Sequence, residues 1–387
     1  MRCNYLTLEN MVKRKICYGI VQPGQSVTDG IPVIKVNNLI SGLKSLSELD
    51  TTTRENEAKY IRTRLHGGEL IISVVGTIGK TAIVPKSFAG CNLVRATALI
   101  DIEDALLSKW VKYYIDSPYG QSYIEQNLNT TVQPTLNIRS LEKMSIPLYD
   151  AEYMKKIVIL LSSLDEKIAI NRAINENLEE QAQALVKEYC SSTDSEIALG
   201  SIMNFVNGFA FQSKSYQKNG KYRIVTIKNV QDGRIDTQGA AYIDEVPAKM
   251  KNECYLRVGD ILLSLTGNVG RVGIVFENNL LLNQRVAKFT SSKDILPLLY
   301  FFFRLSETKV SLETIAKGTA QQNLSPIETL KLSFPYDEGK ALILSQTLKP
   351  MFDSIVNNSV ESSKLAQLRD SLLPKLMSGE INIVTIK

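Results

Sequence analysis

The sequence repeats itself at a nearly constant offset, and this repeat limits the possible folds more than any other feature. Three pairs of segments match in order: PVIKVNNLISG at 32–42 with RIVTIKNVQDG at 223–233, GELIISVVGTIGKTAIV at 68–84 with GDILLSLTGNVGRVGIV at 259–275, and TVQPTLNIRSLEKMSIP at 131–147 with TAQQNLSPIETLKLSFP at 319–335. The first two pairs lie 191 residues apart and the third pair 188. Blocks that recur in order indicate a duplicated structural unit. The sequence therefore predicts two copies of one fold, related by a pseudo-twofold axis.

One repeated segment also contains the strongest catalytic signal, a Gly-Lys-Thr triplet around Lys80. The phosphate-binding loop of nucleotide hydrolases ends in such a triplet, but it begins with a glycine, and Val74 stands in that place. The second copy has Gly-Arg-Val instead, with Arg271 in the position of Lys80. Both copies keep Gly-x-x-Gly between two apolar runs, and glycine allows the positive φ of a tight turn. We predict a β-hairpin that carries one cation towards a phosphate.

Each copy divides into a β-rich part and a long helix, which predicts an α+β protein. The predicted segments are a first globular domain at 1–150, a central helix at 151–190, a second globular domain at 191–337 and a C-terminal helix at 338–387. Each β-rich part also contains one aromatic helix, at 108–117 and 296–307. We expect these aromatic side chains in the core, because they recur at helical spacing.

The two long helices carry the apolar pattern of a coiled coil. Apolar residues follow alternating three- and four-residue steps: Leu161, Leu164, Ile168, Leu178, Ala182 and Leu185 in the first helix, and Leu344, Leu348, Met351, Ile355, Leu365 and Leu372 in the second. Asn171, Asn175 and Asn358 interrupt the pattern, and a buried asparagine fixes the register of a coiled coil. At about 1.5 Å per residue, each helix spans roughly 55 Å. We predict an antiparallel coiled coil that separates the two β-rich domains.

Composition excludes some functions and favours others. The five cysteines form no C-x-x-C pair and there is one histidine, which argues against zinc and His-based metal sites. No apolar run approaches the ~20 residues that span a bilayer, so we expect no membrane contact. The scattered cysteines favour a reduced cytoplasm. The formal net charge is +5, while 152–190 and 338–378 together hold ten basic and eleven acidic residues. The β-rich parts thus carry the basic surplus, where a nucleic acid would bind.

Several segments together resemble a known family. They are YGIVQPG at 18–24, IPVIKVNNL at 31–39, GELIISVVGTIGKTAIV, the T-x-Q blocks before each long helix, LDEKIAINRAINENLEEQAQALVKEY at 164–189 and LLPKLMSGEI at 372–381. This duplicated order, over nearly the whole chain, resembles the specificity subunits of type I restriction–modification enzymes. Lys35 matches the basic residue that the family commonly has within IPVIKVNNL, whereas its repeat equivalent is Thr226.

The resemblance implies a DNA reader that is not itself an enzyme. Each β-rich part would be a target recognition domain for one half of a bipartite sequence in double-stranded DNA. The helices would set the spacer between the half-sites and dock two methyltransferase subunits. The resemblance implies no cofactor in this chain: the partners bind S-adenosylmethionine and methylate adenine. Restriction subunits would use ATP and Mg²⁺ to translocate and cut DNA.

Catalytic motifs are absent from the sequence. A DNA methyltransferase needs a glycine-rich cofactor loop and an Asn/Asp-Pro-Pro-aromatic motif, and neither occurs. The nearest candidates for a carboxylate cluster are ENEAK at 55–59 and DEK at 165–167, which we interpret as solvated surface charge. We interpret His66 as a turn residue. An autonomous nuclease or DNA-modifying enzyme with an unrecognised active site stays open as an alternative, and a protein-binding scaffold is a third.

The candidate DNA-binding residues are polar or basic and fall at loop positions of both copies. They are Lys35, Asn37, Asn38, Thr77, Lys80, Arg95, Gln133 and Asn137 in the first copy, and Lys228, Asn229, Asn268, Arg271, Gln284, Arg285, Gln321, Gln322 and Asn323 in the second. Arginine and lysine suit guanine edges and phosphates, and asparagine and glutamine suit adenine edges. The same residue types also cap turns and hairpins, which is the structural alternative for each of them.

Overall fold

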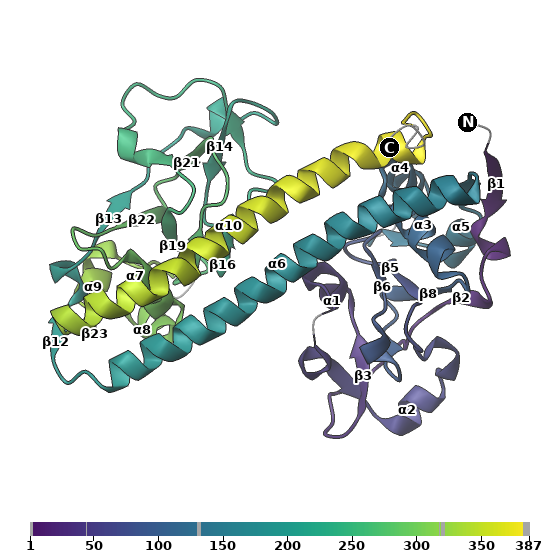
Figure 1. Cartoon of the computed structure of the whole chain (residues 1–387), viewed down its shortest axis with the longest axis horizontal. Coiled ribbons are helices and arrows are strands. Elements are labelled where there is room, and N and C mark those ends of the chain that lie inside the picture. Colours follow the sequence, from purple (N-terminus) through teal and green to yellow (C-terminus); the bar gives the residue numbers. More distant parts are fainter. Residues whose placement is uncertain (1–2, 44, 130–132, 317, 319–321, 382–387) are drawn as a thin grey trace. The chain divides into compact units, whose positions relative to one another are not determined.

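The computed structural model describes residues 3–43, 45–129, 133–316, 318 and 322–381. Its backbone divides into two compact units (Figure 1): unit 1 is Met1–Asp165 with Ala366–Lys387, and unit 2 is Glu166–Leu365. The division falls inside both long helices, so each unit contains part of each helix. The sequence-predicted segments treat the helices as separate parts, and those boundaries stay a prediction.

Unit 1 is built on a four-stranded sheet with the order β2-β8-β5-β6 and a three-stranded sheet β4-β3-β7. Two-stranded pairs β1-β11 and β10-β9 complete it. Its elements are β1 (Asn4–Thr7), β2 (Arg14–Tyr18), β3 (Ile31–Ile34), α1 (Val36–Ser41), β4 (Asp50–Thr52), α2 (Arg54–Ala58), β5 (Leu70–Ser73), β6 (Thr81–Ile83), β7 (Asn92–Leu93), β8 (Thr97–Asp101), α3 (Ala105–Asp116), α4 (Pro118–Gln126), β9 (Leu128–Asn129), β10 (Thr135–Leu136), α5 (Ile138–Glu142) and β11 (Ser145–Leu148).

Unit 2 contains a six-stranded sheet β13-β22-β19-β20-β16-β15, a four-stranded sheet β17-β14-β21-β18 and the pair β12-β23. Its elements are β12 (Glu196–Ala198), β13 (Asn204–Asn207), β14 (Tyr222–Val225), β15 (Val230–Gln231), β16 (Gly233–Ile235), β17 (Tyr242–Ile243), β18 (Tyr255–Leu256), β19 (Ile261–Ser264), β20 (Val272–Ile274), β21 (Leu280–Leu282), β22 (Val286–Thr290), α7 (Leu296–Arg304), α8 (Ser306–Ile315), α9 (Pro326–Leu330) and β23 (Ser333–Pro335).

The two units share strand order and register, which confirms the duplicated fold. The order β2-β8-β5-β6 in unit 1 recurs as β13-β22-β19-β20 in unit 2. Ile71 of β5 pairs with Leu99 of β8, and their repeat equivalents Leu262 and Lys288 pair likewise. The parallel pair β3-β7 recurs as β14-β21. One register for both copies means that loops at equivalent strand ends emerge at equivalent places.

The segment around Lys80 is a β-hairpin, as predicted. Strands β5 and β6 pair antiparallel, as do β19 and β20 in unit 2. Gly76 and Gly79 have φ of 77° and 82°, and Gly267 and Gly270 have 73° and 78°. These are left-handed values that favour glycine, so the Gly-x-x-Gly pattern is a turn requirement rather than a phosphate cradle.

The aromatic helices belong to the cores, as predicted. In unit 1, Trp110 of α3 is fully buried and its indole N–H donates to the Pro147 carbonyl at 2.8 Å. In unit 2, Tyr300, Phe301 and Phe303 of α7 are buried in one cluster that includes side chains of both long helices. Burial of these large side chains holds each sheet on its helices.

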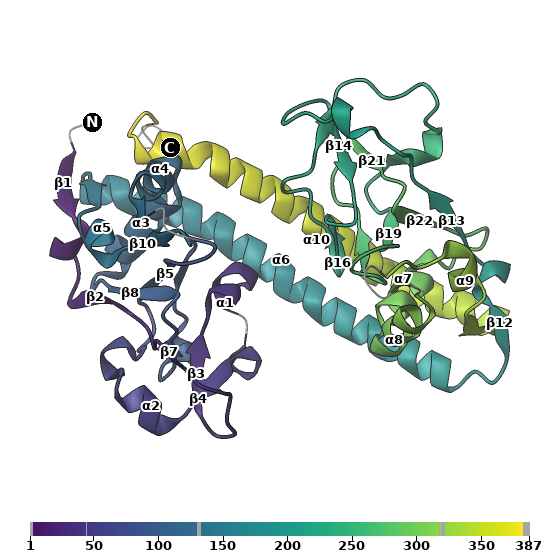
Figure 2. The same cartoon turned by 180° about the vertical axis from the view of Figure 1, so that it is seen from behind.

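The long helices α6 (Ala151–Ser191) and α10 (Glu338–Met377) pack antiparallel within each unit (Figures 1 and 2). In unit 2, the Asn175 amide donates to the Ile355 carbonyl at 3.3 Å, and the Asn171 amide donates to the Glu361 carboxylate at 2.7 Å. From Asn175 to Asn171 the residue number falls along α6, while the bonded residue on α10 rises from Ile355 to Glu361. The two helices therefore run antiparallel. Among the described residues, no helix combines the length and hydropathy needed to cross a membrane.

Candidate nucleic-acid interface

Four loop segments of unit 2 are joined side by side by main-chain hydrogen bonds. We call residues 225–229, 265–271, 283–285 and 322–325 the unit 2 loop cluster. The connecting bonds run from the Asn283 N–H to the Val225 carbonyl (3.1 Å), from Leu265 to Arg285 (3.1 Å), from Leu324 to Leu265 (2.7 Å) and from Gly267 to Gln322 (3.2 Å). Because main-chain bonds hold them, these loops form one fixed surface at the end of the sheets.

Unit 1 has an equivalent arrangement. We call residues 34–38, 74–80, 94–96 and 133–137 the unit 1 loop cluster. The equivalent bonds run from the Val94 N–H to the Ile34 carbonyl (3.1 Å), from Val74 to Ala96 (2.8 Å) and from Leu136 to Val74 (2.9 Å). Each sequence-predicted DNA-binding residue that the structure describes lies in one of these two clusters. Gln321 lies outside the described residues. The structure thus brings together residues that are up to about a hundred positions apart in each copy.

The asparagines of the first loop segment have a structural role. In unit 1, the Lys35 N–H donates to the Asn38 side-chain oxygen at 2.7 Å. In unit 2, the Thr226 N–H donates to the Asn229 side-chain oxygen at 2.9 Å, and the Asn229 amide donates to the Asp236 carbonyl. Asn229 is only 4% exposed. Both asparagines therefore hold their turns, and their contact with DNA stays a prediction.

Lys35 and Arg271 are basic residues that already have partners. The Lys35 ammonium forms an ion pair with Asp50 at 2.5 Å, and this hydrogen bond holds the pKa of the Asp50 carboxyl below its usual range. Arg271 is half-buried and donates to the Gln231 side chain at 2.7 Å. Its repeat equivalent Lys80 is exposed. The two predicted phosphate contacts therefore differ in how freely they can reach a ligand.

Most other predicted residues are exposed. They are Asn37, Thr77, Arg95, Gln133 and Asn137 in unit 1, and Lys228, Asn268, Gln284, Arg285, Gln322 and Asn323 in unit 2. Among the described residues, no hydrogen bond or ion pair engages the side chains of Arg95, Gln284 and Arg285. Exposed polar side chains on a fixed backbone can bind the edges of bases or phosphates.

A hollow of about 630 Å³ opens within the unit 2 loop cluster. Its wall combines polar side chains (Asn207, Gln284, Arg285, Asn323) with the apolar side chain of Ile327, which is 69% exposed. The sequence analysis missed Asn207 and Ile327, although the repeat held a signal. The equivalent of Asn207 is Tyr18, whose hydroxyl accepts a hydrogen bond from the Ile138 N–H at 3.2 Å. The two copies therefore differ in side-chain chemistry at this equivalent position.

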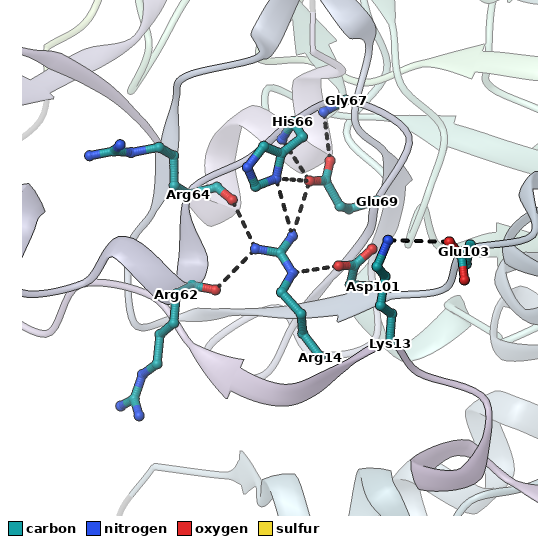
Figure 3. A network of polar contacts seen from close by, with 9 residues as sticks. All are labelled: Lys13, Arg14, Arg62, Arg64, His66, Gly67, Glu69, Asp101 and Glu103. Carbon is teal, nitrogen blue, oxygen red and sulfur yellow. Dashed lines mark hydrogen bonds and ion pairs between the residues drawn. The ribbon is translucent and has the colours of Figure 1, made fainter.

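At the start of β2, Arg14 organises a polar network (Figure 3). Its guanidinium forms ion pairs with Asp101 and with the buried Glu69, and donates to the Arg62 and Arg64 carbonyls at 3.3 Å each. These contacts tie β2 to the end of β8, to the start of β5 and to the loop before it. The positive charge of Arg14 is therefore already compensated.

The loop before β5 contains the single histidine of the sequence, His66. The His66 and Gly67 N–H groups donate to the two oxygens of Glu69 at 2.6 and 2.8 Å, so His66 lies in a bend closed by that carboxylate (Figure 3). Beside it, exposed Lys15 and Arg62 line a hollow of about 590 Å³. The sequence analysis missed these two cations, because neither belongs to a repeated motif.

Two of the carboxylates that the sequence offered as possible catalytic groups, Glu57 and Asp165, are bound by other side chains. Glu57 is 2% exposed, and the Arg64 guanidinium that bonds it holds the pKa of its carboxyl low. Its interpretation as solvated charge is therefore wrong, since Arg64 and Asn92 bind it inside the fold. Asp165 is half-buried and accepts hydrogen bonds from Tyr113 (2.8 Å) and Arg369 (2.7 Å). Among the described residues, no cluster of three His, Cys, Asp or Glu could hold a metal ion.

Known proteins provide an independent comparison. The family model described as type I restriction modification DNA specificity domain matches residues 25–180 and again residues 193–359. The specificity subunit of the type I restriction enzyme EcoBI from Escherichia coli is 30% identical over 154 residues, which cover 39% of this chain and 32% of that protein. In this match the chain spans about a third of the length of its relative.

Two further matches extend over most of the chain. The putative type I restriction enzyme MjaX specificity subunit from Methanocaldococcus jannaschii is 24% identical over 92% of this chain and 88% of that protein. A crystal structure of a type I restriction–modification system S subunit from M. genitalium covers 97% of this chain and 96% of that chain, with a TM-score of 0.53 and 17% identity. The match to the M. genitalium S subunit shows that the two chains share a fold. With two copies of its domain, this chain belongs to the type I restriction–modification DNA specificity family.

Proposed function

We propose that this chain is the sequence-recognition subunit of a type I restriction–modification complex. Each loop cluster reads one half of a bipartite sequence in double-stranded DNA. The observation that carries the proposal is the duplication of one fixed loop surface: the same main-chain bonds present different exposed side chains in units 1 and 2. Base edges specify a sequence, whereas phosphates only position the protein. Two unlike surfaces on one scaffold suit two unlike half-sites.

The long helices supply the other half of the proposed function. They set the spacer between the half-sites and dock two methyltransferase subunits. Exposed apolar side chains support the docking role: Ile159, Ile170 and Ile174 on α6, and Leu342, Ile343 and Leu368 on α10. A contiguous patch of exposed apolar side chains marks protein–protein contacts, and Ile170 and Ile174 are one helical turn apart on α6.

The chemistry of the complex belongs to those partners. The methyltransferase subunits bind S-adenosylmethionine and methylate adenine, and restriction subunits use ATP and Mg²⁺ to translocate and cleave DNA. This chain contributes sequence recognition and no catalytic group, and it acts in the cytoplasm where the chromosome lies.

Copurification followed by DNA selection tests the proposal. The full chain is isolated from cells with the subunits that remain bound to it, and the complex selects from a pool of random duplex DNA. We expect a methyltransferase among the copurified subunits. We also expect enriched duplexes with two specified blocks around an unspecified spacer. An enriched pool without a bipartite motif, or nuclease activity of the isolated chain, would refute the proposal in favour of an autonomous enzyme.

A further inference from the structure

One turn occupies the same place in both loop clusters. In unit 1 it joins β7 to β8 and carries Arg95, whose N–H donates to the Ile20 carbonyl at 2.8 Å. In unit 2 it joins β21 to β22 and carries Gln284, whose N–H donates to the Phe209 carbonyl at 3.0 Å. The backbone therefore fixes both side chains at equivalent points, although the side chains differ in chemistry.

The backbone of the turn is closed on itself in both copies. The Thr97 N–H donates to the Val94 carbonyl at 2.8 Å, and the Val286 N–H donates to the Asn283 carbonyl at 2.9 Å. Buried Asn283 also accepts a hydrogen bond from the Arg285 N–H at 3.3 Å. A turn held at both ends presents its outermost side chain in a fixed direction, which sequence readout requires.

The side chains of Arg95 and Gln284 are more available than those of Lys35, Arg271 and the two capping asparagines. Lys35 is paired with Asp50, Arg271 with Gln231, and the capping asparagines with their own backbone. The side chains of Arg95 and Gln284 are exposed, and no bond to another described residue engages them. They can therefore bind an external partner without first breaking an internal contact.

We propose that Arg95 and Gln284 are equivalent base-reading residues, and that Arg95 reads a G·C pair and Gln284 an A·T pair. The guanidinium of arginine suits the two acceptors of guanine in the major groove, and the amide of glutamine suits the donor and acceptor of adenine. In unit 2, exposed Ile327 on the wall of the same hollow offers an apolar contact to the thymine methyl group. This inference rests on the proposed function and assigns its specificity.

The test is a reciprocal exchange, Arg95→Gln and Gln284→Arg, in the full chain with its copurified subunits. Each complex selects from the same random duplex pool. Gln284→Arg should change one position of one half-site from A·T to G·C, with a preference of about 10- to 100-fold. Arg95→Gln should change one position of the other half-site from G·C to A·T. The second half-site should stay the same in each variant.

Matched controls make the same chemical changes elsewhere. Gln238→Arg alters an exposed residue of unit 2 outside the loop cluster, and Arg54→Gln alters an exposed residue of unit 1. Both should keep the wild-type motif. Unchanged motifs in the exchange variants would overturn the inference, as would equal weakening for all sequences, which identifies a phosphate contact. If the wild-type complex selects no bipartite motif, the proposed function itself fails.

Discussion

Asn38 and Asn229 occupy the same turn in the two units and accept the same main-chain hydrogen bond. Arg95 and Gln284, also equivalent, share a backbone but no chemistry. At the scale of single residues, the duplication thus separates two groups. Asn38 and Asn229 bond the backbone of their turns and keep their type, whereas Arg95 and Gln284 face solvent and differ. We assign scaffold roles to the first group and recognition to the second.

Asn229→Ala should lower the free energy of unfolding by about 1–3 kcal/mol, because buried polar groups at Thr226 and Asp236 lose their partner. Chemical denaturation of the purified chain measures this change. Asn268→Ala, at an exposed residue of the same cluster, is the control and should change stability by less than about 0.5 kcal/mol. Equal stability of both variants would contradict the scaffold role of Asn229.

Lys80→Ala should weaken binding to all duplex sequences and reduce the slope of binding against salt by about one charge. The exposed side chain of Lys80 lies at the hairpin turn and has no hydrogen bond or ion pair among the described residues, as expected for a phosphate contact. Arg271→Ala should have the same kind of effect, although Arg271 first has to leave Gln231. Titrations at several salt concentrations measure the slope. A change in the preferred bases would identify either residue as a base reader instead.

Sequence reasoning located the loop segments correctly because their signals are local: glycines at turns, apolar runs and the repeat itself. It could not separate Asn229, which is buried, from Asn268, which is exposed, since both are loop asparagines in the sequence. It also could not find the pair of Arg271 with Gln231, which lie 40 residues apart. Such contacts depend on how strands pair across the sheet, which a single sequence does not encode locally.

At the scale of elements, the long helices are held by polar contacts as well as by apolar packing. In unit 1, Asp165 of α6 bonds Tyr113 of α3 and Arg369 of α10, so one carboxylate joins three helices. In unit 2, Arg304 of α7 donates to Glu179 of α6 at 2.6 Å. The apolar periodicity of the helices was visible in the sequence. These cross-links were not, because each partner comes from a different element.

Asp165→Ala should lower the free energy of unfolding by about 1–3 kcal/mol, because Tyr113 and Arg369 lose a charged acceptor. The neighbouring Glu166 is exposed, so Glu166→Ala serves as the control with little effect. Thermal unfolding followed by circular dichroism compares the two. If Asp165→Ala is no less stable than the control, the three-helix contact does not stabilise unit 1.

Asn171→Leu should leave the thermal midpoint of the chain unchanged or raise it. Asn171 is fully buried between α6 and α10, and its side-chain oxygen has no partner among the described residues. A buried asparagine in a helix pair fixes the register at a cost in stability, and leucine removes that cost. The same thermal scan measures the effect. A marked drop in the midpoint would mean that the amide bonds to Glu361 and Ser362 outweigh the unpaired oxygen.

At the scale of the whole molecule, helix length should determine the spacer of the recognised sequence. The test inserts four residues after Asp165 in α6 and four residues after Leu365 in α10. Both insertion points lie at the division between the units, so the contacts inside each unit are kept. Each insertion adds about 6 Å. The half-sites should stay the same while the spacer lengthens by about one or two base pairs. DNA selection measures the spacer.

A four-residue insertion after exposed Gln238 is the control, because it lengthens a surface loop and neither helix. The DNA sequence that this control selects should have the same spacer length as the sequence selected by the unaltered chain. If the helix insertions also keep the original spacer with full binding, the helices do not set the distance.

The most direct test of the account is a genome-wide map of methylated adenines after exchange of residues 1–150 for the same segment of another family member. The central claim is that each copy of the duplicated unit reads its own half of one bipartite site. We expect one half of the methylated motif to change and the other half to stay as it was. A change in both halves, or a single continuous motif in either strain, would contradict it.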